Sequence, residues 1–171
     1  GLVAYYPFDG DAKDHSGDGN DGEVFGAIRG PDRFLNQGRS YQFDSSRKQY
    51  ISVQDSEVLQ LSDTDFSISL WCLKNTSAHH PALFKRNPGS IGWRLDVDND
   101  AGVRWMVSGG RDPMVVSGTP LQIGSWHHIC LSYSLSSKEM AIYINSELSG
   151  KYTVRPPNSS PGVNLRIGGD S

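Results

Sequence analysis

The stretch from Gly92 to Gly109, GWRLDVDNDAGVRWMVSG, decides the fold class. Apolar and polar residues alternate on both sides of a turn cluster, DNDAG, and successive residues of a strand point to opposite faces of a sheet. The pattern therefore predicts an antiparallel hairpin. One of its faces carries the large apolar residues Trp93, Leu95, Val97, Val103, Trp105 and Val107. The opposite face carries Arg94, Asp96, Arg104 and Met106.

Similar segments occur on both sides of this hairpin. They are rich in β-branched and aromatic residues, and turn clusters separate them at short, regular intervals. Further strands are expected at residues 1–8, 40–44, 50–53, 66–74, 82–86, 126–134, 140–145 and 164–168. Helical signals are nearly absent, apart from one possible turn within residues 55–63. The sequence predicts a single all-β domain over residues 1–171, an antiparallel sandwich of two sheets.

Composition excludes several classes of function. The net charge is −3 and the 16 Lys and Arg residues are scattered, so the chain lacks the basic surface that a nucleic-acid backbone requires. No apolar run approaches the roughly 20 residues of a membrane-spanning helix, so no membrane insertion is expected. Two cysteines are too few for a disulfide scaffold or a four-cysteine zinc site.

The polar run from Asp9 to Gly22, DGDAKDHSGDGNDG, has the chemistry of a calcium loop, because hard cations prefer several oxygen ligands on a loop that can curl around them. The candidate ligands are Asp9, Asp11, Asp14, Asp18 and Asn20. An EF-hand is excluded, because the twelfth position counted from Asp14 is Phe25 and no helices flank the run. The alternative is a solvated turn in which Asp and Asn side chains cap backbone groups.

A ligand surface is the other candidate site, since sugars stack on aromatic rings and take hydrogen bonds from planar polar groups. The candidate ligand-binding residues are Trp71, Arg94, Trp105 and Arg104, although each tryptophan could instead pack in the core. Trp126 is assigned to the core. The four glutamates are far apart and no paired-carboxylate or nucleophile motif is present, so no enzymatic activity is expected.

Five landmarks, in order, resemble laminin G-like domains of the concanavalin A-like lectin/glucanase superfamily: the opening GLVAYYPFDGDAKDHSGDGNDGEV, then GPDRF…GRSYQFD…QYISV, DFSISLWCLKN, GSWHHICLSYS and KEMAIYINSELSG. The resemblance covers essentially the whole chain. It implies a jelly-roll sandwich of two antiparallel sheets, a structural calcium near the edge of the sandwich, and an extracellular or cell-surface location.

The segments SLWC and HHIC resemble paired strands of the pentraxin branch of this superfamily. That resemblance implies a disulfide between Cys72 and Cys130 and an oxidising compartment. The alternative is two buried free thiols in a reducing compartment.

Laminin G-like domains usually end with one more strand, which returns beside the N-terminal strand, and this chain stops at RIGGDS before it. Either the chain boundary excludes that strand, or a neighbouring segment or chain completes the sandwich.

The expected function is a non-catalytic recognition or adhesion module that binds a glycan or an extracellular protein. The alternatives are an accessory carbohydrate-binding domain of a secreted glycan-degrading enzyme and a structural spacer without a ligand.

Overall fold

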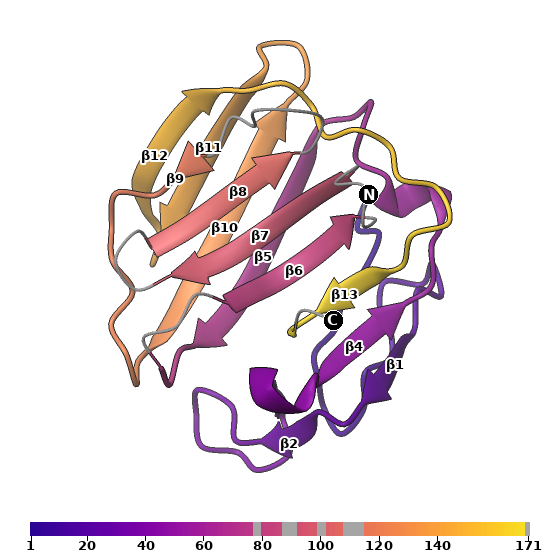
Figure 1. Cartoon of the computed structure of the whole chain (residues 1–171), viewed down its shortest axis with the longest axis vertical. Helices are drawn as coiled ribbons and strands as arrows, with labels where there is room; N and C mark the ends of the chain where they lie inside the picture. The colour runs from indigo at the N-terminus through magenta and orange to yellow at the C-terminus, as the bar shows by residue number, and fades with distance from the viewer. Residues whose placement is uncertain (77–79, 87–91, 99–101, 108–114, 170–171) are drawn as a thin grey trace.

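The computed structural model describes residues 1–76, 80–86, 92–98, 102–107 and 115–169, and structural statements here refer to these residues. Two antiparallel sheets lie face to face (Figure 1). One has the strand order β1-β4-β13-β6-β7-β8-β9 and the other the order β12-β11-β10-β5. A separate two-stranded pair, β2-β3, lies outside both. The predicted all-β sandwich is confirmed.

The strands and the two 3₁₀ turns have the following bounds: β1 Gly22–Phe25, β2 Ile28–Gly30, β3 Ser40–Gln42, η1 Ser45–Arg47, β4 Tyr50–Val53, η2 Glu57–Leu59, β5 Phe66–Leu73, β6 His80–Arg86, β7 Gly92–Asp98, β8 Gly102–Val107, β9 Val115–Val116, β10 Trp126–Ser134, β11 Glu139–Ile144, β12 Glu147–Thr153 and β13 Leu165–Ile167.

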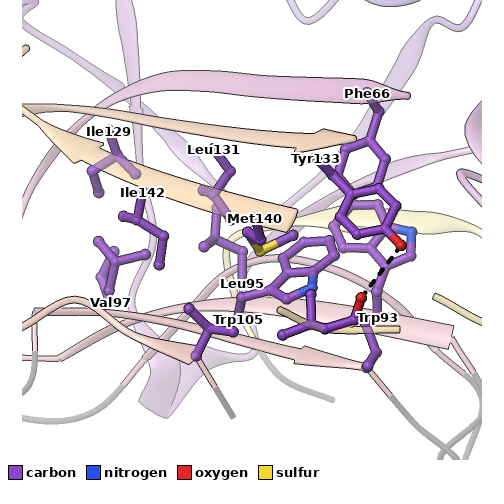
Figure 2. Packing of buried hydrophobic residues seen from close by; sticks show 14 of the residues in the cluster. Phe66, Trp93, Leu95, Val97, Trp105, Ile129, Leu131, Tyr133, Met140 and Ile142 are labelled. Atoms are coloured by element: carbon purple, nitrogen blue, oxygen red, sulfur yellow. Dashed lines mark hydrogen bonds between the residues drawn. The ribbon is translucent and has the colours of Figure 1, made fainter. Parts of the chain in front are cut away.

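The core lies between the two sheets, and the alternation of β7 and β8 builds one wall of it. Leu95 is paired with Trp105, and Val97 with Val103, so the apolar face of the predicted hairpin is confirmed residue by residue. Trp105 is fully buried, and its ring stacks on Trp93 with centroids 5.2 Å apart (Figure 2). The other wall comes from β10, where buried and half-buried residues alternate without a break.

The N-terminal segment differs from its prediction. Residues 1–8 are not part of either sheet. Their backbone carbonyls accept hydrogen bonds from the polar loop that follows. The amide of His15 donates to the carbonyl of Tyr5, and Asn20 Nδ2 donates to the carbonyl of Val3. Phe8, with φ +56, turns the chain away from an extended path. The predicted strand over residues 1–8 is therefore wrong.

Strand β5 is an edge of the four-stranded sheet. Beside it lies a shallow hollow lined by Gly1, Leu2, Asp65, Phe66, Ser67 and Tyr133. The outer backbone edge of β5 could take a further strand, because edge strands present unpaired N–H and C=O groups. Completion of the sandwich by a strand from a neighbouring segment or chain stays a prediction.

The two cysteines are free thiols, so the Cys72–Cys130 disulfide that the resemblance implied is wrong for this structure. Cys72 is paired with His127 and Cys130 with Ser69, three register positions apart along β5 and β10. Residues of opposite parity in paired strands also point to opposite faces of a sheet, so the two sulfur atoms cannot meet. Burial raises the pKa of the Cys72 thiol to about 12, which makes it unreactive.

Alkylation tests whether the thiols of Cys72 and Cys130 are free and which of them is more accessible. We expect two alkyl groups per chain when the protein is unfolded without reductant, because neither thiol is oxidised. In the native protein Cys130, on the outer face, should react before Cys72, which packs against the core. Mass spectrometry after timed alkylation gives both results. A native mass two hydrogens lighter, with no alkylation until reductant is added, would restore the bridge.

Candidate functional site

The aspartate-rich loop is organised around one carboxylate. Asp14 Oδ1 accepts the amides of Tyr5 and Ser16 at 2.8 and 2.9 Å. Asp14 Oδ2 accepts the Ser16 hydroxyl at 2.7 Å and the amide of Asn20 at 2.9 Å. Desolvation raises the pKa of Asp14, but these hydrogen bonds outweigh it and hold the pKa at about 2. Asp14 therefore caps the backbone of the loop.

The other predicted calcium ligands do not converge on Asp14. Asn20 is buried, and both atoms of its amide are engaged, by the carbonyl of Val3 and by the hydroxyl of Ser56. Asp9 pairs with Arg39 at 3.2 Å. Asp11 accepts the amide of Lys13 at 3.1 Å, and Asp18 is exposed.

In the part of the chain that the structure describes, no three or more His, Cys, Asp or Glu side chains form a metal-binding group. The five predicted residues thus do not fit one calcium site in this structure. Binding of calcium by the chain itself stays a prediction.

Replacing Asp14 by asparagine should cost about 1–2 kcal/mol of stability at neutral pH, since hydrogen bonds to a charged acceptor are lost. A carboxyl whose folded pKa is depressed stabilises the fold above its unfolded value, and loses that contribution as pH falls. We therefore expect wild-type stability to fall from pH 3.8 towards about 2, and the Asp14→Asn protein to lose less over this range. Urea unfolding at a series of pH values measures both curves. Asp18→Asn, at an exposed aspartate of the same loop, is the control, and parallel curves for wild type and Asp14→Asn would contradict the capping role.

The structure separates the four predicted ligand-binding residues. Trp105 is 0% exposed and belongs to the core, so its prediction as a binding residue is wrong. Arg94 and Arg104 lie on the outer face of the seven-stranded sheet, where they pair with Asp96 and Asp98. The fourth residue, Trp71, belongs to the four-stranded sheet.

Trp71 lies on the outer face of the four-stranded sheet and is 45% exposed. The guanidinium of Arg33 covers its ring at 4.4 Å, and the ring of His128 lies 5.1 Å from it. His128 Nε2 is 2.8 Å from Ser69 Oγ. A catalytic pair also needs a group that orients the histidine and donors for an oxyanion, and the described contacts supply neither. On this open outer face, Arg33, Trp71 and His128 thus pack side by side.

The same face corrects the assignment of Trp126. It lies at an outward position of β10, next to buried His127, and is half-buried. Its predicted place in the core is wrong, because the alternation of β10 puts His127, Ile129 and Leu131 inside instead.

The outer face of the seven-stranded sheet carries an aromatic and arginine row. Phe25 of β1 and Tyr50 of β4 stack with ring centroids 4.8 Å apart. The guanidinium of Arg166, from β13, lies 4.4 Å from the ring of Tyr50 and 5.7 Å from that of Phe84. Phe84 is in turn paired with Arg94. Arg166 Nη1 is buried and has no hydrogen-bond partner among the described residues.

A polar hollow adjoins this row. It is lined by Asp21, Glu23, Ser52, Gln54 and Asn164. Glu23 is paired with Ser52, and Ser52 with Arg166, so the hollow and the row share one face of β1, β4 and β13. Asn164 Nδ2 donates to the hydroxyl of Ser52 at 3.0 Å and holds this rim in place. The hollow and the row together form the candidate site, which we call the β1–β4–β13 face.

This site was not predicted from the sequence. Its residues come from four separate segments, and strand order within a sheet cannot be obtained from alternation alone. One signal was present: in YISV, Tyr50 and Ser52 alternate with the buried Ile51 and Val53. That pattern predicts a strand whose outer face combines a ring with a hydroxyl.

Comparison with known proteins identifies the family. The family model described as the concanavalin A-like lectin/glucanases superfamily, of the laminin G type, matches residues 44–171. The chain belongs to this family, as its sequence predicted. No curated protein matches the chain.

Solved structures share the fold at low identity. Domain 4 of AbnA, an extracellular GH43 arabinanase from Geobacillus stearothermophilus, in complex with arabinotriose, is 17% identical with a TM-score of 0.74, over 97% of this chain and 82% of that one. A botulinum neurotoxin type C structure, whose cell entry depends on two ganglioside molecules, is 14% identical with a TM-score of 0.66, over 98% and 45%. The sialidase CBM40 of Ruminococcus gnavus, bound to α2,3-sialyllactose, is 14% identical with a TM-score of 0.52, over 64% and 65%.

None of the described helical segments is long and apolar enough to cross a membrane.

Proposed function

We propose that this chain is a non-catalytic glycan-binding module and that the β1–β4–β13 face is its binding site. The observation that carries the proposal is the stacked pair Phe25–Tyr50, with Phe25 exposed and Tyr50 half-buried, beside the polar hollow on one sheet face. Sugar rings stack their apolar C–H faces on aromatic rings, while their hydroxyls need directional polar partners.

The hollow contains both kinds of partner. Asp21 and Glu23 can accept hydroxyl protons, and the amides of Gln54 and Asn164 can donate as well as accept. The guanidinium of Arg166, 4.4 Å from the ring of Tyr50, adds a positive charge on the same face. With two carboxylates at its rim, the hollow favours neutral sugars over sugar acids, since like charges repel in a partly desolvated site.

The three neighbouring structures support a glycan ligand, since the first is a complex with arabinotriose, the second is of a toxin whose cell entry depends on gangliosides, and the third is bound to sialyllactose. An accessory carbohydrate-binding role in a secreted glycan-degrading enzyme draws support from the arabinanase domain, which the chain matches over most of its length. Adhesion through a cell-surface glycan draws support from the toxin binding domain. Both roles place the module outside the cell.

A glycan array followed by calorimetric titration tests the proposal. We expect binding of neutral oligosaccharides, with arabinotriose as the first probe, and no binding of sialyllactose. Phe25→Ala and Gln54→Ala should each weaken binding by about tenfold or more, because each removes one partner at the ligand. Trp71→Ala, on the opposite sheet, is the matched control and should bind as the wild type does.

An array without any bound glycan would contradict the function and favour a protein ligand or a spacer role. Wild-type affinity in both site variants would contradict the site but not the function. The same titrations, repeated in calcium and in chelator, test the predicted calcium. A calcium-dependent rise in melting temperature that Asp11→Ala and Asp18→Ala abolish would support a site at the exposed carboxylates of the loop.

A further inference from the structure

Strands β2 and β3 form a hairpin that belongs to neither of the two large sheets. Its connecting loop places two adjacent apolar side chains in solvent. Phe34 is 66% exposed and Leu35 is 79% exposed, and no other large apolar side chain of the described residues is as exposed as either. We call this pair the apolar tip. Two adjacent side chains at this level of exposure carry a cost in water that a binding partner would remove.

The loop holds the apolar tip in a fixed conformation. Asp32 Oδ1 accepts the amides of Phe34 and Asn36 at 2.8 and 2.9 Å, and Asp32 Oδ2 accepts Asn36 Nδ2 at 3.0 Å. The amide of Leu35 donates to the carbonyl of Asp32 at 3.0 Å. These bonds hold Leu35 at φ +68, a left-handed conformation that is unfavourable for leucine. The loop therefore maintains backbone strain while it exposes leucine to solvent, which is typical of a binding element.

The base of the loop is amphipathic. The guanidinium of Arg33 lies between two rings, 4.3 Å from Phe34 and 4.4 Å from Trp71. Trp71 itself is partly exposed. Two exposed apolar side chains beside an arginine and a partly exposed tryptophan are the residue types that a bilayer surface favours, with apolar groups among the acyl chains and Trp and cations at the interface.

Charge favours an anionic partner. Residues 28–42 contain Arg29, Arg33 and Arg39 against one acid, Asp32, and Asp9 pairs with Arg39 at 3.2 Å from outside this range. The hairpin together with Asp9 therefore has a charge of +1, on a chain whose net charge is −3. The carboxylate of Asp32 is turned inward onto the loop amides. Anionic headgroups attract cationic residues close to the membrane.

We propose that the apolar tip docks on the surface of a bilayer that contains anionic phospholipid, with Phe34 and Leu35 inserted among the acyl chains and Arg33 at the headgroups. This is a shallow contact, and the chain does not cross the bilayer. A projecting tip of two side chains suits a fluid surface, whereas a protein partner would have to supply a matching groove. The inference is independent of glycan binding.

Vesicle flotation of the whole chain tests it. The vesicles contain phosphatidylcholine alone or phosphatidylcholine mixed with phosphatidylserine, without glycolipid, so that binding to sugar cannot contribute. We expect binding to the mixed vesicles, weaker binding to phosphatidylcholine alone, and loss of binding as salt rises. The double variant Phe34→Ser, Leu35→Ser should bind at least about tenfold more weakly, because it buries two fewer apolar side chains.

The matched control is Leu148→Ser, at a leucine 57% exposed on β12, which lies at the far edge of the four-stranded sheet from β5. It should bind vesicles as the wild type does. Both variants change exposed residues and should melt like the wild type. Absence of vesicle binding by the wild type, or equal binding by the double variant, would overturn the proposal. A lipid-free dimer in sedimentation velocity that the double variant dissociates would also overturn it, in favour of a contact between two copies.

Discussion

Replacing Lys85 by methionine is expected to lower the free energy of unfolding by about 3–5 kcal/mol. Lys85 is fully buried on the core side of β6. Its Nζ donates to Asp55 Oδ1 and to the carbonyl of Val163, each at 2.5 Å, and to the carbonyl of Ser160 at 3.3 Å. Methionine retains the apolar stem but removes the donor that these three acceptors share. Gln60 Nε2 still donates to Asp55 Oδ1, and the amide of Val163 still donates to the carbonyl of Ser160. The main loss is therefore the buried cation that pairs with Asp55 and the donor to the carbonyl of Val163.

The expected loss is large because Lys85 holds a connection. Asp55 also accepts the amide of Gly162, and hydrogen bonds from Lys85 and Gly162 outweigh desolvation and keep the pKa of Asp55 below its ordinary value. These contacts hold residues 160–163 against β6, immediately before β13 enters the sheet between β4 and β6. Because β13 carries Arg166, the Lys85→Met protein should also lose order at the candidate site.

Urea unfolding measures the loss, and Lys151→Met is the matched control. Lys151 pairs with Glu139 at 2.9 Å, but both side chains are about half exposed. Exposed pairs contribute little, so the control should lose less than about 1 kcal/mol. Equal losses in the two proteins would contradict the role given to Lys85. In the double variant Asp55→Asn, Lys85→Met, part of the cost should be recovered, because no uncompensated charge remains.

The alternation of apolar and polar residues correctly predicted the parts of the fold in which each strand has one apolar face. The segments at residues 50–53 and 126–134 were predicted with the bounds that the structure has. In these strands, burial of one face fixes the register, since a slip of one residue would expose every apolar side chain. Strand β12 was missed because its residues are mostly exposed and include Gly150, so no apolar face marks it.

Pairing between distant segments explains the remaining errors. A resemblance matched the two cysteine-bearing strands correctly as neighbours, yet the bridge depends on register, and the register places Cys72 opposite His127. Lys85 was predicted within a strand, but nothing local marks it as buried, because its partners lie 30 and 78 residues away. The β1–β4–β13 face was missed for the same reason, because it depends on strand order, which the sequence alone does not contain.

Replacing Trp105 by alanine is expected to cost about 3–5 kcal/mol of stability, the range for deleting a large aromatic side chain from a core. Its ring lies between Trp93, at 5.2 Å, and Phe66, at 5.7 Å, and all three belong to one buried cluster (Figure 2). The cavity left by alanine would border both sheets. Differential scanning calorimetry or urea unfolding should therefore show a much lower midpoint.

Trp105→Phe separates the volume of the side chain from its polar atom. The indole Nε1 of Trp105 is buried without a hydrogen-bond partner, and such a group costs about 1–3 kcal/mol. Phenylalanine removes that cost together with part of the ring, so the two effects oppose each other, and the loss should be less than half that of Trp105→Ala. Trp71→Ala, at the exposed tryptophan, should cost less than about 1 kcal/mol. If Trp105→Ala kept wild-type stability and lost glycan binding, Trp105 would be a ligand residue after all. The depth of its burial argues for the opposite result: binding that is lost only when the sandwich itself unfolds.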